Sequence, residues 1–306
     1  MLPPEISLCW RVRRLTAETD FVANSYSEEN NRGTWRAIQI CGSCLGSLVQ
    51  VYLRQSPFLL ERDFQCFLIE LYAYVVLVAN VSPGSLSEAQ KLEYDSFLLS
   101  LQTLRDCDTF GVILGRAHHV FELIPPVHSL GKKRLQEQEQ HQWVSYCSPA
   151  SASEFLSLER QIRCWDPPED ADTHTKLFAH IYQRGLLAFL YTSFYGRDLS
   201  NLDLLRQLDR CIDDFLPLLL ALPVESPSNV MIGWPLLIVS SCIRSPESRQ
   251  IMRNQIHKID AFFNTAMGPL MDNLLESLWA MQPGEVFGPL GLEAVMKREN
   301  VSFGII

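Results

Sequence analysis

The 306-residue sequence lacks the marks of several large classes of protein. Its longest apolar stretches, around residues 68–81 and 215–222, fall short of the ~20 apolar residues that a membrane-spanning helix needs. The first residues, Met-Leu-Pro-Pro-Glu, do not form a basic and then apolar secretion signal. The net charge of −9 gives the chain no overall attraction to nucleic acid. We therefore expect a protein that neither crosses a membrane nor binds nucleic acid directly through this chain.

Glycine and proline are also scarce, with 15 and 17 positions, whereas 47% of the residues are hydrophobic. This composition excludes long disorder and collagen-like repeats, and it provides ample material for a core. The nine cysteines are odd in number and widely spread, which is typical of a reduced intracellular protein and not of a secreted disulfide scaffold.

The hydrophobic pattern predicts an all-α protein of about ten to twelve helices, since no alternating, strand-like run occurs. Residues 1–33 form a polar N-terminal extension, and residues 34–306 form one multi-helix domain. The stretch 132–153 is the best candidate for a mobile insertion, with a charged helix or exposed loop at 132–141. The expected helices are 34–56, 61–81, 87–107, 109–124, 153–164, 172–195, 200–222, 234–243, 246–267, 269–281 and 290–299.

A single CxxC motif, Cys41 to Cys44, invites a redox or zinc interpretation. Helical spacing places both cysteines on one apolar helix face, whereas a thioredoxin-type motif follows a strand. No second CxxC or histidine pair at ligand spacing accompanies the motif. We interpret these cysteines as part of a close helix crossing.

Two adjacent histidines, His118 and His119, lie within the helix expected at 109–124. The core face of that helix is formed by Phe110, Ile113, Leu114, Ala117, Val120, Phe121 and Ile124. His118 falls on the opposite face, four residues before Glu122, so we expect an ordinary surface pair.

An acidic cluster, Asp209, Asp213 and Asp214, raises the possibility of magnesium-dependent isoprenoid chemistry. The spacing of a DDxxD box is absent, because Phe-Leu-Pro-Leu follows Asp213 and Asp214. We interpret the aspartates as the solvated outer side of a helix. The sequence thus predicts no metal site and no cofactor.

The helix expected at 172–195 is apolar around nearly its whole circumference, which is typical of a buried, central helix. His180 and Arg184 are then at least partly enclosed and need polar partners. Two arrangements remain open: both face a ligand cavity, or they pair internally with an acid such as Asp209.

Residues 176–197, KLFAHIYQRGLLAFLYTSFYGR, resemble the "LF…HLYQRALLIYLYR" segment in the regulatory domain of fungal zinc binuclear-cluster transcription factors. The stretch 232–256 resembles the most distinctive part of that family, with Trp234-Pro235, an apolar helix and then Ser-Pro-Glu-x-Arg at 245–249. The segments 274–279 and 291–306 are similar to its closing motifs. The resemblance extends over about 170–306 and, more weakly, back to about residue 34.

This resemblance implies an all-α module that regulates transcription, often of a metabolic or secondary-metabolite pathway, and that works in a homo- or heterodimer with a transcription regulator. We expect it in the nucleus or cytoplasm. Trp234, Pro235 and Arg249 are expected to be structural, with Arg249 tying a helix start to a neighbour. The chain departs from the family pattern because it has no six-cysteine cluster for two zinc ions, only a short basic patch at Arg11, Arg13 and Arg14.

Three hypotheses follow. The chain is a regulatory domain whose DNA-binding part lies elsewhere, or it is a co-regulator that pairs with a DNA-binding partner. Alternatively, the helical fold binds or converts a small molecule, either as a sensor of an apolar metabolite or as an enzyme. An enzyme would catalyse a metal-independent cyclisation or isomerisation, and its candidate catalytic residues are His180, Tyr182, Arg184 and Asp209.

Overall fold

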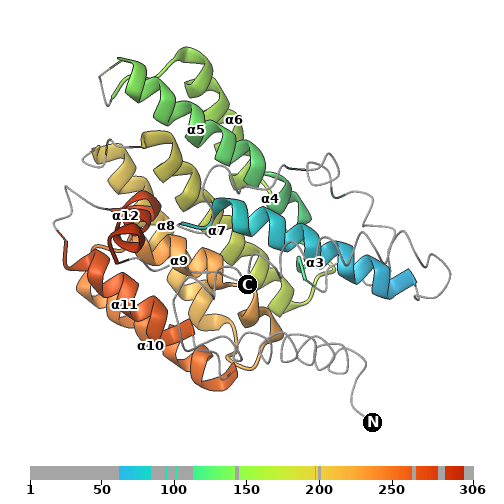
Figure 1. Ribbon diagram of the computed structural model, residues 1–306. Helices are drawn as coiled ribbons and strands as arrows, with labels where there is room; N and C mark the ends of the chain where they lie inside the picture. Colours follow the sequence, from blue (N-terminus) through green and yellow to red (C-terminus); the bar gives the residue numbers. More distant parts are fainter. Residues whose placement is uncertain are drawn as a thin grey trace, which may run out of the picture. The chain divides into compact units, whose positions relative to one another are not determined.

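The computed structural model describes residues 62–83, 94, 101, 113–141, 145–196, 198, 201–263, 267–281 and 287–299. All of them lie in the second of the two units, Met1–Leu60 and Glu61–Ile306, into which the chain divides. These residues form helices and no strand, which confirms the all-α prediction (Figure 1). None of the helices described is long and apolar enough to cross a bilayer. The expected boundary near residue 33, the Cys41–Cys44 motif and, apart from residues 94 and 101, the helix at 87–107 fall outside the described residues.

Helix α7 (Thr173–Tyr195) is the central element, and its bounds agree with the prediction. The Asp172 carboxylate caps its first turn by accepting hydrogen bonds from the backbone N–H groups of His174 and Thr175. Gly196, with φ of +56°, ends it. The helix is buried nearly all round because four helices pack against it. They are α5 (Ile124–His141), α6 (Pro149–Arg163), α8 (Leu202–Ala221) and α9 (Gly233–Ser241).

The C-terminal helices cover α9. Helices α10 (Pro246–Phe263) and α11 (Met267–Trp279) run side by side and antiparallel (Figure 1). Helix α12 (Gly288–Glu299) packs on α9 and α11. The remaining elements are α3 (Arg62–Val81), α4 (His118–Glu122) and the short 3-10 helix η4 (Pro227–Val230).

The prediction of one helix over 109–124, ending at Pro125-Pro126, is wrong. A turn occupies residues 113–116, with positive φ at Gly115 and Arg116, and α4 begins only at His118. The two prolines instead lie in the first turn of α5, where a missing backbone N–H leaves no hydrogen bond unmade. The segment 132–141 is the second half of α5, which packs against α7.

The boundary expected near Met267 is also displaced. Helix α10 ends at Phe263, and α11 begins at Met267, two residues before the expected Pro269. The side-chain carboxylate of Asp260 accepts a hydrogen bond from the backbone N–H of Gly268 at 3.1 Å, and so connects the two helices.

The core consists of aromatic rings gathered around the middle of α7. Tyr182 contacts Phe121, Phe178 and Trp234, with ring centroids 4.5, 4.9 and 6.1 Å apart. At Gly185, α7 approaches α9 so closely that an added Cβ would lie 2.5 Å from Cβ of Pro235. The absence of a side chain at this position is therefore what allows α7 and α9 to cross.

Candidate functional site

Tyr182, one of the four catalytic candidates, lies in the core of the described helices. Its side chain is fully buried, and its hydroxyl donates a hydrogen bond of 2.5 Å to the backbone oxygen of Met231. The hydroxyl of Tyr74 donates to the same oxygen at 3.0 Å. Burial, and next the neighbouring Tyr74, raise the pKa of Tyr182 far above its usual value. Tyr182 therefore stays protonated at neutral pH and joins α7 to α3 and to the segment before α9.

His180 and Arg184 lie one helical turn apart and are both half-buried. Both contact the side-chain oxygen of Gln183, His180 through Nδ1 at 3.3 Å and Arg184 through Nη1 at 3.1 Å. The amide nitrogen of Gln183 donates to the backbone oxygens of Ile162 and Trp165, both at 2.6 Å. Gln183 thus caps the end of α6, a role that the sequence pattern did not reveal.

Arg184 also forms an ion pair, but not with the aspartate named in the prediction. Its Nε lies 3.2 Å from Oδ2 of Asp214 on α8. Asp209 pairs instead with Arg244, at 2.6 Å. Asp213 and Asp214 are exposed, as predicted for the outer side of a helix.

No hydrogen bond or ion pair joins any two of His180, Tyr182, Arg184 and Asp209 in the described part of the chain. His180 and Arg184 share the side-chain oxygen of Gln183, whereas Tyr182 and Asp209 have other partners. The phenol of Tyr182 is enclosed, and Asp209 is at the surface. These four side chains do not assemble one reaction centre with a common substrate position.

The prediction that His118 lies on the surface and pairs with Glu122 is wrong. His118 is buried, with 8% of its surface exposed, and His119 is the residue that contacts Glu122, at 3.0 Å. The turn at Gly115 and Arg116 delays the helix start to His118, so His118 lies in the first turn of a five-residue helix instead of in the middle of a long one. The predicted core positions of this segment that the structure describes are all buried: Ile113, Leu114, Ala117, Val120, Phe121 and Ile124.

A polar network on α5 was not anticipated at all. Glu137 accepts hydrogen bonds from the hydroxyls of Ser148 and Ser151, at 2.5 and 2.7 Å, and pairs with Arg134. Arg134 in turn donates to the backbone oxygen of Phe194, at the end of α7. Burial by itself would raise the pKa of Glu137, but these hydrogen bonds outweigh it and lower the pKa to about 2. The network connects α5, α6 and α7.

The corner between α9 and α10 contains the Trp-Pro and Ser-Pro-Glu-x-Arg motifs. Trp234 is fully buried, and Ser245 caps α10 by accepting a hydrogen bond from the backbone N–H of Ser248 at 3.3 Å. Arg249 donates through Nε to the backbone oxygen of Ile243 at 3.1 Å, and its guanidinium lies 5.1 Å from the ring centre of Trp279. Arg249 therefore ties the start of α10 to the turn after α9 and to α11, in line with the predicted tie of a helix start to a neighbour.

A small surface hollow opens beside this corner. Its walls come from the end of α9, the start of α10, the end of α11 and the residue before α12. They are formed by Ser241, Ile243, Arg244, Arg249, Leu278, Trp279, Met281 and Phe287. Within the described ranges, no group of three or more histidine, cysteine, aspartate or glutamate side chains is placed to hold a metal ion.

A family model described as "Fungal specific transcription factor domain" matches residues 26–304 of the chain. The match includes α7, the α9–α10 corner and the helices that cover them. Neither a curated protein nor a solved structure matches the chain significantly.

Proposed function

The chain belongs to the family of fungal specific transcription factor domains, and on that premise we propose that it regulates the genes of a metabolic or secondary-metabolite pathway. In this proposal the chain acts in the nucleus, as one half of a homo- or heterodimer. The observation that carries the proposal is the match over residues 26–304, which spans every described helix.

The contacts of α7 support a regulatory role rather than catalysis. Its polar side chains bind helix ends and neighbouring helices, as Gln183 does with α6 and Arg184 does with Asp214. No specific observation favours the enzyme hypothesis. The printed sequence contains no six-cysteine cluster, so we propose that contact with DNA comes from a dimer partner or from another part of the protein.

A regulator of metabolism has to respond to the state of the cell. We propose that this domain does so by binding a small molecule that controls its activity. Binding to one conformation of the domain would shift its population and so change its assembly with the transcription machinery.

Transcript analysis tests the regulatory role directly. Deletion of the gene should change the transcript levels of one set of metabolic genes, and re-expression of the intact chain should restore them. Re-expression of Trp234→Ala, which removes a fully buried side chain, should not restore them, whereas Leu202→Ala at an exposed position should. Unchanged transcripts in the deletion strain, measured under conditions in which the gene is expressed, would contradict the proposal.

A separate measurement tests the dimer. Sedimentation equilibrium of the purified chain, alone and with candidate zinc-cluster regulators, should show a mass of two chains. A mass of one chain in every mixture would overturn this part of the proposal and leave the transcript result unaffected.

A further inference from the structure

Helix α8 has two faces of different character. Its inner face is apolar and buried, and it packs against α7. Its outer face has exposed side chains three or four residues apart, which is the spacing that places residues along one side of a helix. We call this set the α8 stripe, and it consists of Leu202, Arg206, Arg210, Asp213, Pro217 and Leu220.

The two ends of the α8 stripe are apolar. Leu202 is 66% exposed, more than any other large hydrophobic residue that the structure describes, and Leu220 is 53% exposed. A single exposed leucine needs no explanation. Here two of them lie at opposite ends of one stripe, with charged residues between them.

The middle of the stripe carries two opposite charges, Arg210 and Asp213, that form no ion pair in the described part of the chain. They are three residues apart, with the basic residue first, and this order is the less favourable one for a pair within a helix. The other charged side chains of α8 are all paired: Asp203 with Arg206, Asp209 with Arg244 and Asp214 with Arg184.

Pro217 adds a second acceptor at Asp213. Proline has no backbone N–H, so the backbone oxygen of Asp213, four residues before Pro217, lacks its usual helical partner. Asp213 therefore offers a carboxylate and a backbone oxygen to the same neighbour. A guanidinium has five N–H donors, which is enough for both.

The order of residues in the stripe is self-complementary. A two-fold axis at the level between Arg210 and Asp213 places a second copy of α8 antiparallel to the first. Arg210 then lies opposite Asp213 of the second copy, and Leu202 lies opposite Leu220 of the second copy. Both matches hold to within about one residue, which is a rise of about 1.5 Å. Because of the symmetry, each match occurs twice.

The opposite orientation does not fit. Two parallel copies of α8 in register would place arginine against arginine and aspartate against aspartate, and like charges directly opposite each other repel. The charge pattern thus favours an antiparallel pair.

We propose that the α8 stripe is the surface through which two copies of this chain form a symmetric homodimer, with Arg210 of each copy paired with Asp213 of the other. The inference rests on the dimer put forward under the proposed function, and it names the partner as a second copy and the surface as α8. It concerns assembly alone. A monomeric chain whose deletion still changes transcripts would therefore overturn it and leave the transcriptional role intact.

The test is sedimentation equilibrium of the purified full chain over a range of concentrations, with charge reversals on α8. Arg210→Asp and Asp213→Arg should each raise the dissociation constant of the dimer at least about tenfold, because each turns both symmetric attractions into repulsions. The double variant, which carries both reversals, should regain most of the lost affinity, because opposite charges again face each other across the axis.

The double variant also guards against a folding defect, since a second reversal does not repair a misfolded chain. Arg160→Asp, at an exposed arginine of α6 without an ion pair among the described residues, is the matched control and should leave the dissociation constant unchanged. Three results would each overturn the inference: a chain that stays monomeric alone, single reversals without effect, or a double variant as weak as the single ones.

The leucines at the ends of the stripe give an independent test. Leu202→Asp places a charge against Leu220 of the second copy and should weaken the dimer, whereas Leu202→Ala keeps an apolar side chain at the edge of the interface and should have little effect. Leu156→Asp, at a leucine of α6 that is 59% exposed, is the control and should not weaken the dimer. Equal dissociation constants for Leu202→Asp and Leu156→Asp would contradict the assignment to α8.

Discussion

Helix α7 and the α9–α10 corner use their polar side chains in different ways. Along α7, Gln183, Arg184 and Tyr182 are each engaged by a helix end, an aspartate or a backbone oxygen. At the corner, Arg249 is only partly engaged, since its Nε has a partner and its guanidinium has no carboxylate within 4.0 Å in the described ranges. The two regions are in contact, because α7 packs on α9.

The difference lies in how completely the fold engages the polar groups of each region. A buried polar group whose hydrogen bonds are all made within the protein stabilises the fold. It has no donor or acceptor free to bind a ligand. Arg249 is held by one hydrogen bond and one aromatic contact, so in the described structure it fixes the start of α10. Both regions therefore use polar side chains to hold helices together, and they differ in how many partners each side chain has. The predictions below test this division, beginning with the largest expected effect.

Trp234→Ala should have the largest effect. The ring is fully buried between Tyr182 and Phe189, with centroids 6.1 and 5.7 Å away, so its removal leaves a cavity where α7 and α9 meet. We expect a loss of about 3–5 kcal/mol in the free energy of unfolding, measured by urea denaturation. Trp234→Phe should lose less, because it keeps a ring and removes an indole N–H that has no hydrogen-bond partner among the described residues. Equal losses in the two variants would show that the cavity is not the cause.

Gly185→Ala tests the close crossing of α7 and α9. The added Cβ would lie 2.5 Å from Cβ and 3.0 Å from Cα of Pro235, so the backbone of α9 has to move. Alanine normally stabilises a helix relative to glycine by about 1 kcal/mol. Here we expect the opposite sign, a destabilisation of about 2 kcal/mol by the same urea assay.

Gly131→Ala is the matched control for this crossing. Its Cβ would meet Ser193 at 3.0 Å, first at side-chain atoms, so its effect should be smaller than that of Gly185→Ala. A stabilising Gly185→Ala would mean that the two helices are less tightly packed than the structure indicates.

The pH dependence of stability tests the network on α5. The pKa of Glu137 is about 2 in the folded protein and 4.5 without its partners. Because the folded value is the lower one, Glu137 contributes its full stability above about pH 4.5 and loses it as the pH falls towards 2. Glu137→Gln should lower stability at pH 7 by about 1–3 kcal/mol and flatten the acid limb of the pH profile.

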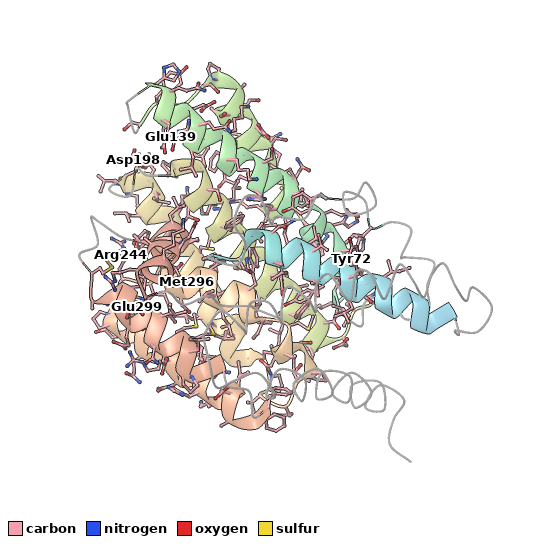
Figure 2. All side chains as sticks on the ribbon, in the orientation of Figure 1. Tyr72, Glu139, Asp198, Arg244, Met296 and Glu299 are labelled. Carbon is pink, nitrogen blue, oxygen red and sulfur yellow. The ribbon has the colours of Figure 1, made fainter. Side chains whose placement is uncertain are left out.

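Glu139→Gln, at an exposed position on the same helix, is the control for this effect (Figure 2). Its acid limb should follow that of the unchanged protein. An acid limb of Glu137→Gln as steep as that of the unchanged protein would show that the network with Ser148 and Ser151 is not the source of the pH dependence.

These contrasts also show how far the sequence could predict the fold. The bounds of α7 follow from local signals: Asp172 as a cap, Gly196 as a stop and apolar residues all round. The helix expected at 109–124 failed for a non-local reason. The carboxylate of Glu70, on α3, accepts hydrogen bonds from the backbone N–H groups of Ile113 and Leu114, at 3.1 and 2.7 Å. The two partners of this contact are more than 40 residues apart in the sequence. The spacing of residues within one helix therefore could not predict it.

The candidate site was predicted in part, for a related reason. The Ser-Pro-Glu-x-Arg pattern correctly indicates the cap at Ser245 and the tie made by Arg249. The pairings of Arg184 and Asp209 were not predictable, because they depend on which faces of α7, α8 and α10 meet. The hollow could not be predicted from the sequence either. Its lining residues come from separate segments between Ser241 and Phe287 and follow no regular spacing.

His180→Ala should have the smallest effect and gives the sharpest test of the division between the two regions. The ring is half-buried and its contact with Gln183 is 3.3 Å long, so we expect stability to change by less than about 0.5 kcal/mol. A strain carrying this variant should keep the transcript pattern and the metabolite profile of the unchanged strain. Loss of one metabolite, with transcripts unchanged, would instead favour catalysis at α7 and contradict the assignment of its polar side chains to the fold.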